Sequence, residues 1–106
     1  MDDKRAVICK LIDFYAGVLS TRQREVLELY YYEDFSLAEI AENLGITRQG
    51  VRDNIKHGEE ALFDFEDKLG LIKKNVFISE TAHRIIELTD NEKIKELASE
   101  IIVSCS

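Results

Sequence analysis

The chain has 106 residues, which is room for one domain of ordinary size or for a small domain with an appendage. Hydrophobic residues make up 45% of the chain and proline is absent, so the composition excludes a disordered chain and favours an all-α protein. The formal net charge of −7 at pH 7 argues against a surface that attracts nucleic acid everywhere.

The N-terminal residues mix charged with apolar side chains, and nowhere do roughly 18 apolar residues follow one another. We therefore expect a cytoplasmic protein that does not insert into a membrane. Cys9 and Cys105 lie at opposite ends of the chain, without the spacing of a metal or redox site, which predicts two free thiols. A reactive thiol is the alternative interpretation.

Apolar residues that recur at three- and four-residue steps predict six helices. They cover residues 3–18, 21–32, 37–44, 48–69, 71–88 and 91–102. Ser20 and Ser36, each followed three positions later by Gln or Glu, predict capping boxes at the second and third helices. Gly45 is predicted to end the third helix in a left-handed conformation, and Thr47 and Asp90 are predicted to cap the fourth and sixth helices.

Residues 36–56 have the pattern of a helix-turn-helix followed by a long fourth helix. Ala41 is the small residue expected where the two helices cross, and Gly45 is the turn. The apolar side chains that would fix the second helix across the first are Ile40, Leu44, Ile46, Val51 and Ile55. The alternative is two unrelated helices that meet at a glycine.

The exposed face of the fourth helix carries the candidate nucleic-acid contacts. Arginine can bind guanine and Gln or Asn can bind adenine, whereas lysine suits a phosphate. The candidates are Arg48, Gln49, Arg52, Asn54 and Lys56, with Arg22 and Arg24 as further phosphate contacts. An ordinary solvated polar face is the competing interpretation.

Acidic residues follow these candidates directly, because residues 59–70 hold five acidic side chains against Lys68, a net charge of −4. Since affinity for DNA depends largely on neutralising phosphates, we expect weak binding to duplex DNA with a shallow salt dependence.

The aromatic residues divide into core and contact candidates. Within the run from Tyr30 to Tyr32, we expect Tyr30 to pack in the core with Leu27. The alternative is that the three rings form an aromatic platform on which bases stack, but consecutive helical residues point in different directions. Phe63 lies away from the buried stripe and is the candidate contact for a partner or a second copy. Together with the apolar C-terminal residues it predicts a homodimer.

The two C-terminal helices have their own apolar stripes. The sixth helix is expected to bury Ile94, Leu97, Ala98 and Ile101. We expect residues 1–70 to form the helix-turn-helix domain and residues 71–106 to form a helical extension docked on it. The sequence has no metal-ligand spacing, no phosphate-binding glycine loop and no nucleophile motif, so neither an enzyme nor a cofactor is expected.

Residues 19–62 resemble the fourth region of bacterial sigma factors, in which a helix-turn-helix recognises a promoter element. The phrases LSTRQREVLELYY, EIAENLGITRQGV and DNIK resemble the YlxM family of small bacterial helix-turn-helix proteins. That resemblance implies a helical bundle with a long recognition helix, and a regulatory or accessory part in the signal recognition particle pathway. The part in the pathway is implied because such proteins are typically encoded beside the particle's GTPase. The helix-turn-helix itself implies a DNA-binding regulator as the alternative.

Overall fold

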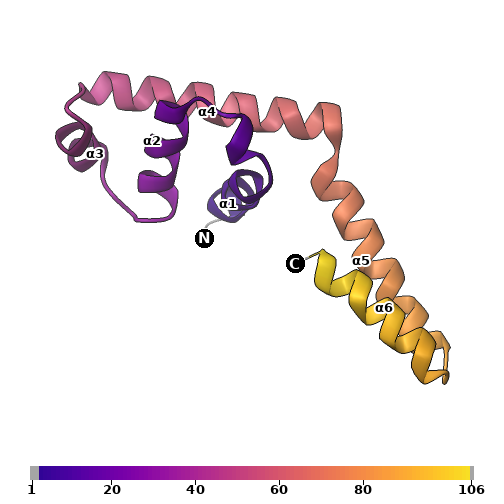
Figure 1. The fold of residues 1–106 in the computed structure, drawn as a ribbon. Coiled ribbons are helices and arrows are strands. Elements are labelled where there is room, and N and C mark those ends of the chain that lie inside the picture. Colours follow the sequence, from indigo (N-terminus) through magenta and orange to yellow (C-terminus); the bar gives the residue numbers. More distant parts are fainter. Residues whose placement is uncertain (1–2, 106) are drawn as a thin grey trace. The chain divides into compact units, whose positions relative to one another are not determined.

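The computed structural model describes residues 3–105, and every regular element in that range is helical (Figure 1). The elements are α1 (Asp3–Tyr15), the 3-10 turn η1 (Ala16–Val18), α2 (Thr21–Tyr31), α3 (Leu37–Leu44), α4 (Arg48–Leu69), α5 (Leu71–Leu88) and α6 (Glu92–Ser104). The predicted all-α fold is confirmed. The chain forms two compact units, the first ending at Leu69 and the second beginning at Gly70.

Local capping chemistry fixes where the helices of the first unit begin. The Ser36 hydroxyl accepts a hydrogen bond from the Glu39 N–H at 3.1 Å, and the Glu39 carboxylate accepts one from the Ser36 N–H at 2.7 Å. The bond from the Ser36 N–H, followed by the Ser36 side chain, lowers the pKa of the Glu39 carboxyl. Ser20 forms the same capping box with Gln23, so both predicted boxes are confirmed.

The turn between α3 and α4 is also formed as predicted. Gly45 has φ +69°, a left-handed conformation that glycine adopts at little cost. The Thr47 hydroxyl accepts a hydrogen bond from the Gly50 N–H at 2.9 Å, which caps α4.

The second and sixth helices differ from their predicted ranges by one or two residues, and two further predictions at helix ends are wrong. The first helix ends at Tyr15, because residues 16–18 tighten into η1. The sixth helix is capped by Asn91 and not by Asp90: the Asn91 Oδ1 accepts hydrogen bonds from the N–H groups of Lys93 (2.9 Å) and Ile94 (3.1 Å). Asn and Asp cap helices equally well, so residue type alone does not decide between two adjacent candidates. The residue at which the helical backbone begins decides which of them is the cap.

The core of the first unit forms where α1, α2 and α3 lie along one side of α4 (Figure 1). At the helix-turn-helix, Ala41 is buried beside Val26, Ile40 and Val51, which confirms the predicted crossing. The remaining buried apolar residues of this unit are Ile8, Leu11, Ile12, Tyr15, Leu27, Tyr31 and Leu62. Each of the three preceding helices therefore contributes buried side chains that cover α4.

Polar contacts tie α1 to distant parts of the first unit. The Tyr15 hydroxyl donates a hydrogen bond to Glu66 Oε1 at 2.5 Å, and the Tyr15 ring stacks on Phe65 with 6.1 Å between centroids. Arg5 donates hydrogen bonds to the carbonyls of Tyr31 (2.9 Å) and Tyr30 (3.3 Å), and also pairs with Asp34. The guanidinium thus satisfies backbone acceptors that the end of α2 leaves open.

The second unit is a hairpin of α5 and α6, which lie side by side (Figure 1). Among its described residues only Ala82 and Ala98 are buried. The predicted burial of Ile94, Leu97 and Ile101 is wrong, because their exposed fractions are 42%, 58% and 39%. Two helices cover only the side chains that face each other, and here those are mainly small.

No helix within residues 3–105 combines the length and the apolar character needed to cross a membrane.

Candidate functional site: the recognition helix and its groove

The helix-turn-helix presents the first turns of α4 to solvent. The N–H groups of Gly45 and Ile46 both donate to the Ala41 carbonyl, which closes the turn, and the buried Val51 fixes α4 against the core. On the opposite side of α4, the side chains of these turns are exposed. This is the arrangement in which such a helix meets a partner.

The structure places four of the predicted contact residues on that open side. Arg48, Gln49, Arg52 and Lys56 are all exposed. Asn54 is different, because it is half-buried and its amide donates a hydrogen bond to the Gly50 carbonyl of the same helix at 2.8 Å. The Asn54 amide is therefore engaged within α4.

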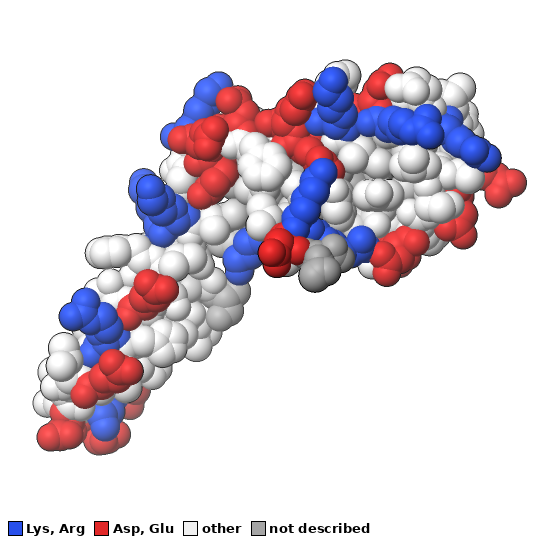
Figure 2. All heavy atoms as spheres, turned by 180° about the vertical axis from the view of Figure 1, so that it is seen from behind, with Lys and Arg blue, Asp and Glu red and all other residues white. Residues whose placement is uncertain are grey.

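Neighbouring acids reduce the positive charge available at this surface. Gln49 donates a hydrogen bond to Asp53 at 3.0 Å. On α2, Arg22 pairs with Glu25 at 3.6 Å and Arg24 pairs with Glu28 at 3.1 Å. Figure 2 shows the same mixture, with Lys and Arg side chains interspersed among Asp and Glu side chains on the face in view.

Three cations are left without a carboxylate partner. Among the described residues, no Asp or Glu oxygen lies within ion-pair distance of Arg48, Arg52 or Lys56. These three are the cations that an incoming anion would meet first.

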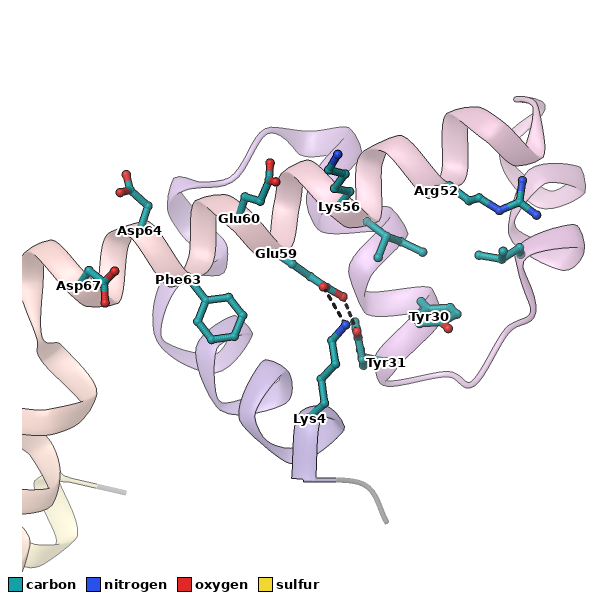
Figure 3. A pocket seen from close by; sticks show the side chains of 12 residues that line it. Lys4, Tyr30, Tyr31, Arg52, Lys56, Glu59, Glu60, Phe63, Asp64 and Asp67 are labelled. Atoms are coloured by element: carbon teal, nitrogen blue, oxygen red, sulfur yellow. Dashed lines mark hydrogen bonds and ion pairs between the residues drawn. The ribbon is translucent and has the colours of Figure 1, made fainter.

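A groove of about 740 Å³ runs along α4 from Arg52 to Asp67, where the start of α1 and the end of α2 approach it (Figure 3). Its apolar lining is Tyr30, Leu37, Ile55 and Phe63. Phe63 is 45% exposed, as predicted from its position on the helix. Cationic residues lie at the end toward Arg52, and acidic residues including Glu60 and Asp67 lie at the other end. The groove can therefore bind a peptide segment that carries both apolar and charged side chains.

Glu59 holds one wall of the groove together. It accepts a hydrogen bond from the Tyr31 hydroxyl and pairs with Lys4 at 3.3 Å (Figure 3). Sequence reasoning missed this contact, because nothing local relates Lys4 to a residue in the middle of α4. As predicted, Tyr30 packs against the core, half-buried and with its ring edge-on to Tyr31 at 5.0 Å. Sequence did not predict that Tyr31 is buried more deeply than Tyr30.

Two tyrosines ionise with difficulty in the folded chain. Burial, followed by the hydrogen bond to Glu59 and the negative charge of that carboxylate, raises the pKa of Tyr31 well above its ordinary value of 10.0. Burial and the hydrogen bond to Asp13 raise the pKa of Tyr32 in the same direction. Both phenols must therefore stay protonated for these contacts to persist.

We expect the stability of the first unit to fall as the pH rises above about 10. The unfolded chain releases the phenol protons near their ordinary pKa, whereas the folded chain retains them, so the stabilisation is complete below that pH and is lost above it. Urea unfolding at a series of alkaline pH values measures this fall. Tyr31→Phe is expected to make the fall shallower, and an identical pH dependence in that variant would contradict the assignment.

Residues 3–105 contain no group of three His, Cys, Asp or Glu side chains that could hold a metal ion. Cys9 and Cys105 are both free and half-buried, as predicted.

A family model described as "Putative helix-turn-helix protein, YlxM / p13 like" matches residues 2–101. The chain belongs to this family, UPF0122. The match covers both compact units, so the family includes the C-terminal hairpin as well as the helix-turn-helix.

Curated relatives carry the same family name. A UPF0122 protein of Thermoanaerobacter sp. (strain X514) is 49% identical over 75 residues, which are 71% of this chain and 64% of the relative's length. A UPF0122 protein of Halalkalibacterium halodurans is 42% identical over 91% of this chain and 88% of its own. One from Streptococcus pneumoniae (strain Hungary19A-6) is 40% identical over 89% of this chain and 86% of its own. The chain is similar to each of them, and their names state the family alone.

Proposed function

We propose that this protein is a non-enzymatic accessory or regulatory component of the signal recognition particle pathway, acting in the cytoplasm. In this proposal the helix-turn-helix unit is a scaffold for binding a component of the particle, and it does not read DNA tightly. The resemblance to YlxM-type proteins supports the choice of pathway. The charge distribution along α4 supports the choice of a scaffold.

The charge distribution is the observation that carries the proposal. Three unpaired cations on α4 neutralise few phosphates, and the arginines of α2 already pair with glutamates. Beyond Lys56 the surface of α4 turns acidic, with Glu60, Asp64 and Asp67 beside the groove. A partner of mixed charge with an apolar side chain fits this surface better than a uniformly anionic duplex does.

Two matched variants test whether the groove or the first turn of α4 binds the particle. Phe63 lines the groove, and Arg48 lies in the first turn of α4, outside the groove. The affinity-tagged protein is used to capture the particle's RNA and GTPase from cells. We expect Phe63→Ala to reduce capture severalfold and Arg48→Ala to leave it unchanged. Absence of particle components from the wild-type capture would refute the pathway, and equal loss in both variants would refute the groove.

The alternative function is a DNA-binding regulator, which the helix-turn-helix and the unpaired cations Arg48, Arg52 and Lys56 favour. We expect any binding to duplex DNA to be weak and to depend little on salt. With three phosphates neutralised, log affinity against log salt should have a slope of roughly −3 per protomer. Titration of a labelled duplex at several salt concentrations measures this slope.

Arg48→Ala should then lower the magnitude of the slope by about one unit. Phe63→Ala serves as the control, because it removes no charge. Nanomolar binding to a defined sequence at physiological salt, lost in Arg48→Ala, would favour the regulator over the scaffold.

A further inference from the structure

The second unit is too small to bury a core by itself. Its two helices meet at Ala82 and Ala98, the only buried side chains among its described residues. Alanines allow helices to approach closely but cover little apolar surface. Units below about 40 residues usually need a partner or a second copy to be stable. The large apolar residues of the hairpin therefore need cover from elsewhere.

These residues form one stripe on each helix. On α5, Leu71, Ile78 and Ile85 recur at seven-residue steps and have exposed fractions of 41%, 45% and 37%. On α6, the exposed stripe is Ile94, Leu97 and Ile101, at steps of three and four. Such spacings keep side chains on one side of a helix. We call these six residues the hairpin face.

Both stripes lie on the same side of the hairpin. At 100° per residue, the stripe on α5 is rotated by roughly 40° from Ala82, and the stripe on α6 by roughly 70° from Ala98, in the same sense. Because α5 and α6 run antiparallel, rotations of the same sense place both stripes on one face. A hollow of about 390 Å³, lined by Lys73, Lys74, Phe77 and Ile78, adjoins it near the start of α5.

Charge makes a second copy a suitable occupant. The second unit carries five basic and six acidic residues, a net charge of −1, whereas the whole chain carries −7. Two hairpins therefore repel each other little. The outer edge of the hairpin face carries Arg84 on α5 and Glu100 on α6, each rotated by roughly 160° from the buried alanine in the sense of the stripe, whereas Glu96 is rotated by roughly 160° in the opposite sense. Among the described residues none of these three has an ion-pair partner.

The two edge charges lie within one helical turn of each other. Asn75 donates a hydrogen bond to the Cys105 carbonyl at 3.1 Å, which sets residue 75 of α5 level with residue 105 of α6. Counting inward along both helices, Glu100 is level with residue 80, about one helical turn from Arg84. A two-fold axis parallel to the helices would place α5 of one copy opposite α6 of the other, with these two edges in contact.

We propose that the hairpin face binds the same face of a second copy, so that two hairpins form a four-helix bundle in which Arg84 pairs with the partner's Glu100. The contact is self-complementary: the same ion pair forms twice, and six apolar side chains of each copy become buried. This dimer does not depend on the proposed pathway.

Sedimentation velocity across micromolar concentrations tests the dimer. The wild-type chain is expected at twice its 12.2 kDa mass. Ile78→Glu, which places a charge in the face, should sediment as a monomer. His83→Glu is the matched control, because His83 is exposed on the opposite side of the same helix. A monomeric wild type, as expected if the hairpin is covered by its own first unit, would overturn the proposal.

Exchanging the two charges of the ion pair distinguishes a lost contact between the two copies from a failure of the chain to fold. Arg84→Glu and Glu100→Arg should each weaken the dimer severalfold, and the double variant should restore it. A dimer that is indifferent to Ile78→Glu, or single charge variants without effect, would place the interface elsewhere and refute the proposal.

Discussion

Leu27→Ala is expected to lower the free energy of unfolding of the first unit by about 2–5 kcal/mol. Leu27 has an exposed fraction of 0%, and its side chain fills the space between α2 and the middle of α4. Truncation removes apolar contacts and leaves a cavity that the surrounding helices can close only in part.

Urea unfolding followed by tyrosine fluorescence measures this loss in the first unit alone. The chain has four tyrosines and no tryptophan, and all four tyrosines lie before Leu69. Val7→Ala is the control, because Val7 is 47% exposed on α1. An unfolding midpoint that shifts equally in both variants would show that Leu27 does not fill the contact.

Gly58→Val is expected to cost about 3 kcal/mol, near the upper end of the range for overpacked cores. A Cβ atom at Gly58 would lie 2.7 Å from Leu27 Cδ1 and 3.3 Å from Leu27 Cγ, and Leu27 has no free space into which to move. The gain in helix propensity over glycine, about 0.5 kcal/mol, does not offset this overlap. The same unfolding measurement applies.

The two substitutions should be coupled, because both act on one contact. In a Leu27→Ala background the valine fills part of the cavity, so the cost of Gly58→Val should fall by more than 1 kcal/mol, within the range of coupling seen for touching residues. Gly17→Val is the control, since a Cβ there meets nothing within 4 Å. Strictly additive losses for Leu27 and Gly58 would contradict the close contact between α2 and α4.

The features that sequence predicts well here are local ones. The capping boxes at Ser20 and Ser36, the left-handed Gly45 and the Thr47 cap each depend on residues within three or four positions. Helix periodicity likewise identified α4 as one long helix, and it placed Phe63 on the exposed side.

The features that sequence missed depend on which elements meet. Periodicity shows that α6 has an apolar side, but it does not show whether α5 covers that side, and Leu97 is in fact 58% exposed. Tyr31 is buried more deeply than Tyr30, and it is held by Arg5 from α1 and by Glu59 from α4. The wall of the groove, formed by Lys4 and Glu59, joins residues too far apart for any local pattern to relate.

The long-range contacts of α1 also set a timing for folding during synthesis. Tyr15 binds Glu66, 51 residues later in the chain, and Lys4 binds Glu59. At translation rates of about 5–20 residues per second, roughly 3–10 s pass between the synthesis of α1 and that of its partners in α4. Throughout that interval the apolar side of α1, with Ile8 and Ile12, has no α4 to cover it. The apolar residues of α1 are therefore synthesised several seconds before the helix that covers them exists.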